Sequence, residues 1–106
     1  MSTPNQVATK MEYIQKLFLG VQDYMRSQPE MEVEDLITTL DAETPEFRSI
    51  AYESASFGLG LFDFSKGTKL IEWEKLYKRS GKVHYFHLDI GLGWAFAKTK
   101  RIPEIG

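Results

Sequence analysis

Two segments of this chain carry small residues at helical spacing, and this pattern constrains the fold more than any other feature. The first segment, 45–64, places four small residues along one broad face: Ala51, Ser54, Ala55 and Gly58. The second, 83–99, places Gly91 and Ala95 one turn apart. Because side-chain bulk sets the distance between helix axes, two such faces can approach closely. The pattern predicts that these two helices pair at the centre of the fold.

Three further segments have apolar residues at steps of three and four, which is typical of amphipathic helices. They span residues 7–27, 31–43 and 69–81. With the two small-residue segments they predict an all-α fold, a compact bundle of about five helices with short connections. We expect one domain over 1–106, with residues 1–6 and 100–106 as flexible tails.

Local signals suggest where these helices begin and end. Pro29 stops the first helix, because the residue before a proline resists the α conformation. Thr44 and Pro45 together form a start signal, a capping side chain followed by a residue suited to the first helical position. Gly81 is placed to end the fourth helix. An alternative makes the stretch VHYFHLDIGL, 83–92, a β-strand, since it is rich in aromatic and branched residues.

Composition excludes several classes of protein. The 13 basic and 15 acidic side chains leave a net charge of −2, which does not match a nucleic-acid-binding face. The absence of cysteine excludes disulfides, thiolate metal sites and a cysteine nucleophile. The N-terminus lacks the apolar region of a secretory signal, and no apolar run is long enough to span a bilayer. These features predict a soluble, cytoplasmic protein.

The paired small-residue helices have two interpretations, and the sequence leaves both open. In the first, they form a close-packed crossing. In the second, the missing side chains leave a slot for an apolar small molecule, with polar groups at its edge. The candidate binding residues in the second interpretation are Tyr52, Ser54, Phe57, Gly58, Gly91, Gly93 and Trp94.

Three residues are candidates for acid–base chemistry. Glu53 lies among small and apolar residues, surroundings that suit a general acid or base. His84 and His87 are three residues apart, on one face of the last predicted helix. The spacings that identify helical zinc and di-iron sites are absent, so no metal site is predicted. Gly91 and Gly93 lack the third glycine of a dinucleotide-binding loop, and no cofactor is predicted.

Two motifs resemble those of a known family. AYESASFGLGLFD, 51–63, is similar to an Ala-Tyr-Glu-Gly-Ala-Ala motif, and GLGWAFAK, 91–98, to a Gly-x-Gly-Trp-Ala-x-Ala-Arg segment. Both belong to an uncharacterised bacterial domain-of-unknown-function family associated with enediyne polyketide biosynthesis clusters. The chain resembles the N-terminal part of these longer proteins. Ser54 replaces the family's glycine, and Lys98 stands where arginine is frequent. The resemblance implies a helical domain and no established activity.

Aromatic residues make up 13% of this short chain, more than one small core readily hides. Surplus apolar surface generally marks an interface or a ligand groove. We therefore expect a non-catalytic interaction or assembly module that self-associates or binds a protein partner. The family resemblance further suggests that it is accessory to a bacterial biosynthetic pathway. The alternative is an enzyme or carrier for a hydrophobic small molecule, with Glu53 as acid or base and a histidine assisting.

Overall fold

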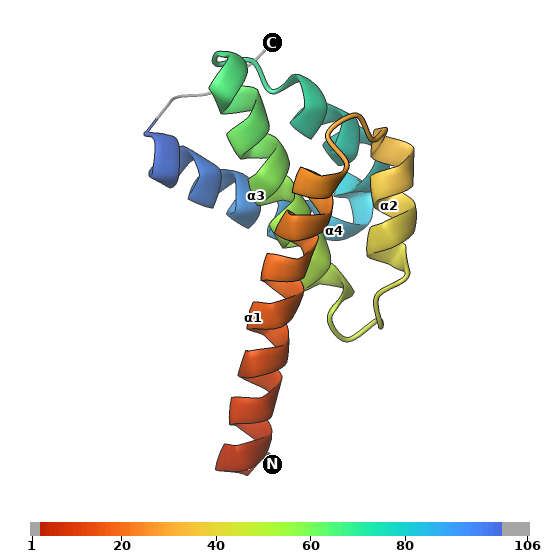
Figure 1. Cartoon of the computed structure of the whole chain (residues 1–106), viewed down its shortest axis with the longest axis vertical. Helices are drawn as coiled ribbons and strands as arrows, with labels where there is room; N and C mark the ends of the chain where they lie inside the picture. Colours follow the sequence, from red (N-terminus) through yellow and green to blue (C-terminus); the bar gives the residue numbers. More distant parts are fainter. Residues whose placement is uncertain (1–2, 101–106) are drawn as a thin grey trace.

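The protein is an all-α domain, as predicted. The computed structural model describes residues 3–100, and over that range it contains four helices instead of about five (Figure 1). They are α1 (Pro4–Ser27), α2 (Val33–Asp41), α3 (Arg48–Lys66) and α4 (Ile71–Thr99). None of these helices combines the length and apolar character that crossing a membrane requires.

The first helix begins at Pro4, three residues before the apolar pattern that starts at Val7. Thr3 caps it by accepting a hydrogen bond from the backbone of Gln6, whose side chain accepts one from the backbone of Thr3 in return. This reciprocal arrangement satisfies two otherwise unpaired N–H groups, and Pro4 suits the first helical position. Part of the predicted tail 1–6 is therefore the first turn of α1. Lys100, the first residue of the other predicted tail, directly follows α4. The rest of the two predicted tails, residues 1–2 and 101–106, lies outside the described residues.

The start signal at Thr44 and Pro45 precedes α3 by a turn. The backbone N–H of Phe47 donates to the carbonyl of Thr44 at 3.1 Å, and the helix proper begins at Arg48. The prediction of a helix from residue 45 was wrong because Thr44 and Pro45 start a separate tight turn. At the other end, Gly67 has a φ of 150°, which residues with a side chain rarely adopt, and α3 stops there.

Residues 69–81 and 83–99, predicted as two helices, form one. Gly81 does not end a helix: it is buried within α4, and its absent side chain leaves room for the ring of Tyr77. The strand alternative for 83–92 is also wrong, because this stretch is helical. A kink at His84, with φ −113° and ψ 16°, separates the two halves of α4. Ser80 and Gly81 lie just before it, a pair that commonly accompanies helix kinks.

The third helix is the centre of the domain. It packs most extensively on α4, then on α1, with α2 covering a smaller area. The N-terminal half of α1 extends beyond the other helices (Figure 1). The largest fully buried apolar side chains come from α2, α3 and α4: Leu36, Leu40, Tyr52, Phe64, Leu76 and Leu88.

Candidate functional site

The packing of α3 on α4 places Tyr52 and Glu53 opposite the two histidines. The ring of Tyr52 stacks on His84, with centroids 3.9 Å apart and planes 14° from parallel. The carboxylate of Glu53 lies 2.9 Å from Nδ1 of His87. Two adjacent residues of α3 thus contact two histidines that are about one turn apart on α4. The three candidate catalytic residues are close in space, but only Glu53 and His87 bond to each other.

Tyr52 anchors this cluster in the core. Its side chain is 2% exposed, and its hydroxyl donates a hydrogen bond to Asp41 at 2.6 Å. Burial, together with this hydrogen bond, raises the pKa of Tyr52 to about 12. The phenol therefore remains a neutral donor at physiological pH, and it links the end of α2 to α3.

His84 is partly buried beside Tyr52, and its Nδ1 lies 3.3 Å from the hydroxyl of Ser49. Burial lowers the pKa of His84; the carboxylate of Asp41 opposes this shift, and the positive charge of Arg48 adds to it. The lowered pKa favours the neutral form of the imidazole. Over residues 3–100, no group of three histidine, aspartate or glutamate side chains gathers to hold a metal ion.

The glycine at position 91 marks the closest approach of α3 and α4. A side chain there would collide with the carbonyl of Glu53 and would lie 2.8 Å from Cβ of Ser56. At Gly60 on α3, a side chain would lie 2.8 Å from Cβ of Ala95. The two helices are therefore in close contact at this point, with backbone atoms of α3 directly against Gly91.

The face of α3 that carries Ser54 and Gly58 was predicted to pack on the last helix, but these two residues contact α1. Ser54 donates a hydrogen bond to the carbonyl of Phe18 at 2.7 Å and accepts one from Gln22 at 2.9 Å. Gly58 faces the side chain of Met25. Phe57 packs its ring against Phe18, with centroids 5.8 Å apart. Three of the candidate binding residues, Ser54, Phe57 and Gly58, are therefore part of the α1–α3 interface.

Two buried polar residues of α3, Ser56 and Asp63, have structural roles that the sequence did not predict. Ser56 donates to the carbonyl of Leu88 at 2.5 Å and accepts from the indole N–H of Trp73 at 2.6 Å. Asp63 is 3% exposed and accepts backbone N–H bonds from Trp73 at 2.8 Å and Glu72 at 3.2 Å. Burial raises the pKa of Asp63, and these two N–H groups oppose that shift. Asp63 thereby caps α4 from the preceding helix, across the loop between α3 and α4. No local sequence motif predicts this contact.

The remaining candidates, Gly93 and Trp94, lie on the exposed side of α4. Among residues 3–100, no atom beyond the local backbone and chain neighbours lies within 4 Å of the position a Cβ would take on Gly93, and Trp94 is 60% exposed. Trp94 belongs to an apolar stripe opposite the buried face of the helix, which we term the outer face of α4. The outer face consists of Val83, Phe86, Ile90, Trp94 and Ala97.

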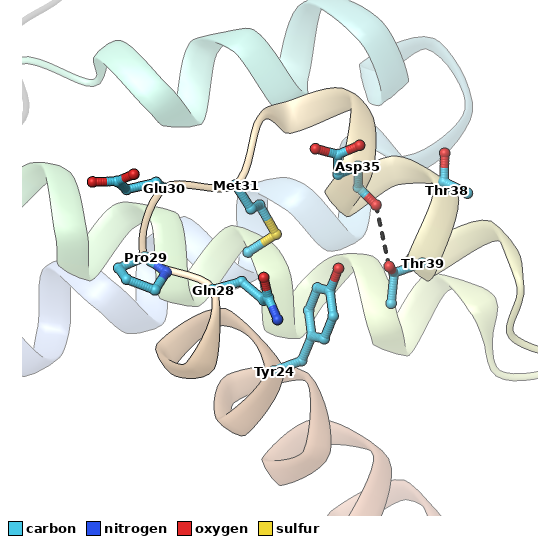
Figure 2. A pocket seen from close by; sticks show the side chains of 8 residues that line it. All are labelled: Tyr24, Gln28, Pro29, Glu30, Met31, Asp35, Thr38 and Thr39. Atoms are coloured by element: carbon cyan, nitrogen blue, oxygen red, sulfur yellow. Dashed lines mark hydrogen bonds between the residues drawn. The ribbon is translucent and has the colours of Figure 1, made fainter.

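Two hollows lie on either side of the loop between α1 and α2. One, of about 440 Å³, is lined mainly by apolar side chains of α1, α2 and α3. The other, of about 640 Å³, is more polar and lies between the end of α1 and α2 (Figure 2). Gln28, Pro29 and Met31 border both. In Figure 2 the side chain of Met31 points from the loop toward Tyr24.

The fold and these contacts define a small all-α domain with a tightly packed pair of helices and an exposed aromatic face. The chain belongs to the family described as "Protein of unknown function (DUF1702)", which matches residues 1–105. Comparisons with curated proteins and with solved structures found no match. The expected resemblance to a domain-of-unknown-function family is thus confirmed at the level of the family.

Proposed function

We propose that this domain is a non-catalytic assembly module that forms a homodimer through the outer face of α4. The observation that carries the proposal is the exposure of large apolar side chains along this stripe. Val83 is 77% exposed, and Phe86 and Trp94 are each 60% exposed. Single exposed apolar residues are common, but a continuous stripe of them marks an interaction surface.

The second half of α4 is apolar on two opposite sides. Leu88, Gly91 and Ala95 face α3 and are buried, while the outer face points away from it. A helix that is apolar around most of its circumference is expected to be covered on both sides. Residues 3–100 cover only one side, so the proposed partner covers the other.

The spacing of the outer face favours a second copy of the chain as that partner. Within the second half of α4, Phe86 and Trp94 are four residues on either side of Ile90. An antiparallel pair with its twofold axis at Ile90 would place Phe86 of each copy near Trp94 of the other, as an isologous interface requires. The stripe offers on the order of 500 Å² per protomer. Two copies would bury about 1,000 Å², where specific interfaces begin.

Sedimentation equilibrium over a wide concentration range tests the dimer. We expect the wild-type chain to dimerise and its melting temperature to rise with concentration. Phe86→Gln and Trp94→Gln should both give monomers that remain folded. Phe62→Gln is the matched control, because Phe62 is 46% exposed but lies on α3. A monomeric wild-type chain, or equal loss of the dimer in Phe62→Gln, would overturn the proposal.

The proposed cellular role is accessory to a bacterial biosynthetic pathway, in the cytoplasm. It is supported by the resemblance of the 51–63 and 91–98 motifs to a family associated with enediyne polyketide clusters, and by the absence of cysteine. Deletion of the gene from a producing strain should lower the yield of the product without changing its structure. Loss of one chemical step would instead indicate an enzyme.

A second candidate function is acid–base chemistry at Glu53 and His87. The carboxylate–imidazole contact at 2.9 Å favours it, because a carboxylate on one ring nitrogen orients the other nitrogen for proton transfer. The side chains are 17% and 29% exposed, respectively, so the pair is reachable from solvent. This candidate would make the domain an enzyme or carrier for a hydrophobic small molecule.

Chemical modification tests this second candidate without knowledge of a substrate. If Glu53 orients and activates His87, diethylpyrocarbonate should modify His87 several-fold more slowly in Glu53→Gln than in the wild-type chain. Glu43→Gln is the matched control on another part of the surface. Equal rates in the wild-type chain and Glu53→Gln would exclude an activating role for Glu53.

A further inference from the structure

The apolar hollow of about 440 Å³ lies away from both the α3–α4 crossing and the outer face of α4. The end of α1, the loop 28–32, the start of α2 and the second half of α3 surround it. Its volume falls within the range of small-molecule sites, roughly 300–1,000 Å³. Its lining is mainly apolar and includes Met25, Met31 and Leu61, with Gly58 beside them.

Gly58 and two flexible methionine side chains allow the shape of this hollow to change. A Cβ on Gly58 would lie 2.8 Å from Sδ and Cε of Met25, so the missing side chain is what lets Met25 occupy its position. Met31 borders the hollow from the loop, outside any helix. Methionine is unbranched and flexible, and it adapts its shape to apolar ligands more readily than leucine does.

Three charged residues line the hollow; Arg26 and Glu72 have ion-pair partners, and Glu32 is exposed to solvent. Arg26 pairs with Asp23 at 2.6 Å, and Glu72 pairs with Lys75 at 2.8 Å. A charged ligand would have to compete with these pairs, whereas an uncharged one would gain affinity from apolar burial alone. The mainly apolar lining, together with these two ion pairs, therefore favours a neutral molecule.

We propose that the hollow between α1, α2 and α3 binds an uncharged apolar small molecule, with Met25, Met31 and Leu61 contacting it. This site shares no residue with the outer face of α4, so it does not depend on the proposed dimer. It also lies on a different face of α3 from Glu53, so it does not depend on acid–base chemistry.

Fluorescence titration with N-phenyl-1-naphthylamine tests the site, because this uncharged probe brightens in apolar surroundings. We expect saturable binding of one probe per chain. Leu61→Gln and, in the loop, Met31→Gln should each weaken binding roughly tenfold or more by placing a polar group against the probe. Leu19→Gln is the matched control, since Leu19 is 61% exposed on α1 and does not line the hollow.

The loop variant keeps the test valid if Leu61→Gln fails to fold, because Met31 lies outside the helices. Unchanged binding in folded Met31→Gln or Leu61→Gln would overturn the site. So would the absence of saturable binding by the wild-type chain. If Trp94→Gln lost binding while Met31→Gln and Leu61→Gln kept it, the probe would bind at the outer face of α4, and the proposal would be refuted.

Discussion

Gly91 on α4 lies directly against the carbonyl group of Glu53 on α3, in a space that admits no side chain. The neighbouring atoms of α3 include the backbone nitrogen of Phe57, which would lie 2.9 Å from an added Cβ. Backbone atoms of a packed helix cannot move aside as the tip of a flexible side chain can. This contact therefore sets how closely α3 and α4 approach each other.

The glycines at 91 and 93 should respond in opposite directions to the same substitution. We expect Gly91→Ala to lower the free energy of unfolding by about 1–3 kcal/mol through overpacking. We expect Gly93→Ala to raise it by up to about 1 kcal/mol, because alanine favours the helix and no other side chain of residues 3–100 lies within 4 Å of the new atom. Urea denaturation of the two variants measures both effects. A stabilised Gly91→Ala would contradict the close contact.

The hydroxyl of Ser56 should be important for stability. Ser56→Ala removes the acceptor of the Trp73 indole N–H and the donor to the carbonyl of Leu88, in a site without exposed surface. Leaving a buried N–H unpaired costs about 1–3 kcal/mol. Ser65→Ala is the control, because the Ser65 hydroxyl bonds to a carbonyl at an exposed position. Equal denaturation midpoints for the two variants would show that the buried network contributes little.

Asp63 should stabilise the start of α4 although it belongs to α3. We expect Asp63→Ala to lower the free energy of unfolding by about 0.5–2 kcal/mol, as for other lost helix caps. Asp63→Asn should recover part of this loss, since an amide oxygen can still accept from Trp73. Asp89→Ala, at an exposed position on α4, should have little effect. Hydrogen exchange at the amides of Glu72 and Trp73 locates the effect; unchanged protection in Asp63→Ala would refute the capping role.

The stability of the domain should fall in acid because of His84. Burial lowers the pKa of His84 in the folded chain below its usual 6.5, so the unfolded chain binds the proton more readily. The stabilising contribution is complete above pH 6.5 and is lost as the pH falls through the lowered folded pKa. Urea denaturation between about pH 8 and about pH 5 measures the loss. His84→Gln should reduce this pH dependence, and an identical slope in the variant would exclude His84 as its source.

Local sequence signals were sufficient for the helical class and for most of the segments that are helical. Apolar spacing identified the region of each helix, because the contacts that favour a helix are between residues three and four apart. Pro29 correctly marked the end of α1. The same local rules failed at Gly81, where a glycine that suits a helix end instead makes room for the ring of Tyr77 within α4. A glycine has both uses, and only its neighbours in space distinguish them.

The amino-acid pattern alone thus determines most of the segments that are helical and that two of its helices carry faces thin enough for close packing. The tertiary structure decided how those helices are rotated about their axes. Gly91 and Ser56 meet at the α3–α4 contact, while Ser54 and Gly58 turn toward α1. That rotation also brings Glu53 to His87 and leaves Trp94 exposed. Helix formation depends on neighbours along the chain, whereas rotation depends on packing all the helices together, and no single segment encodes it.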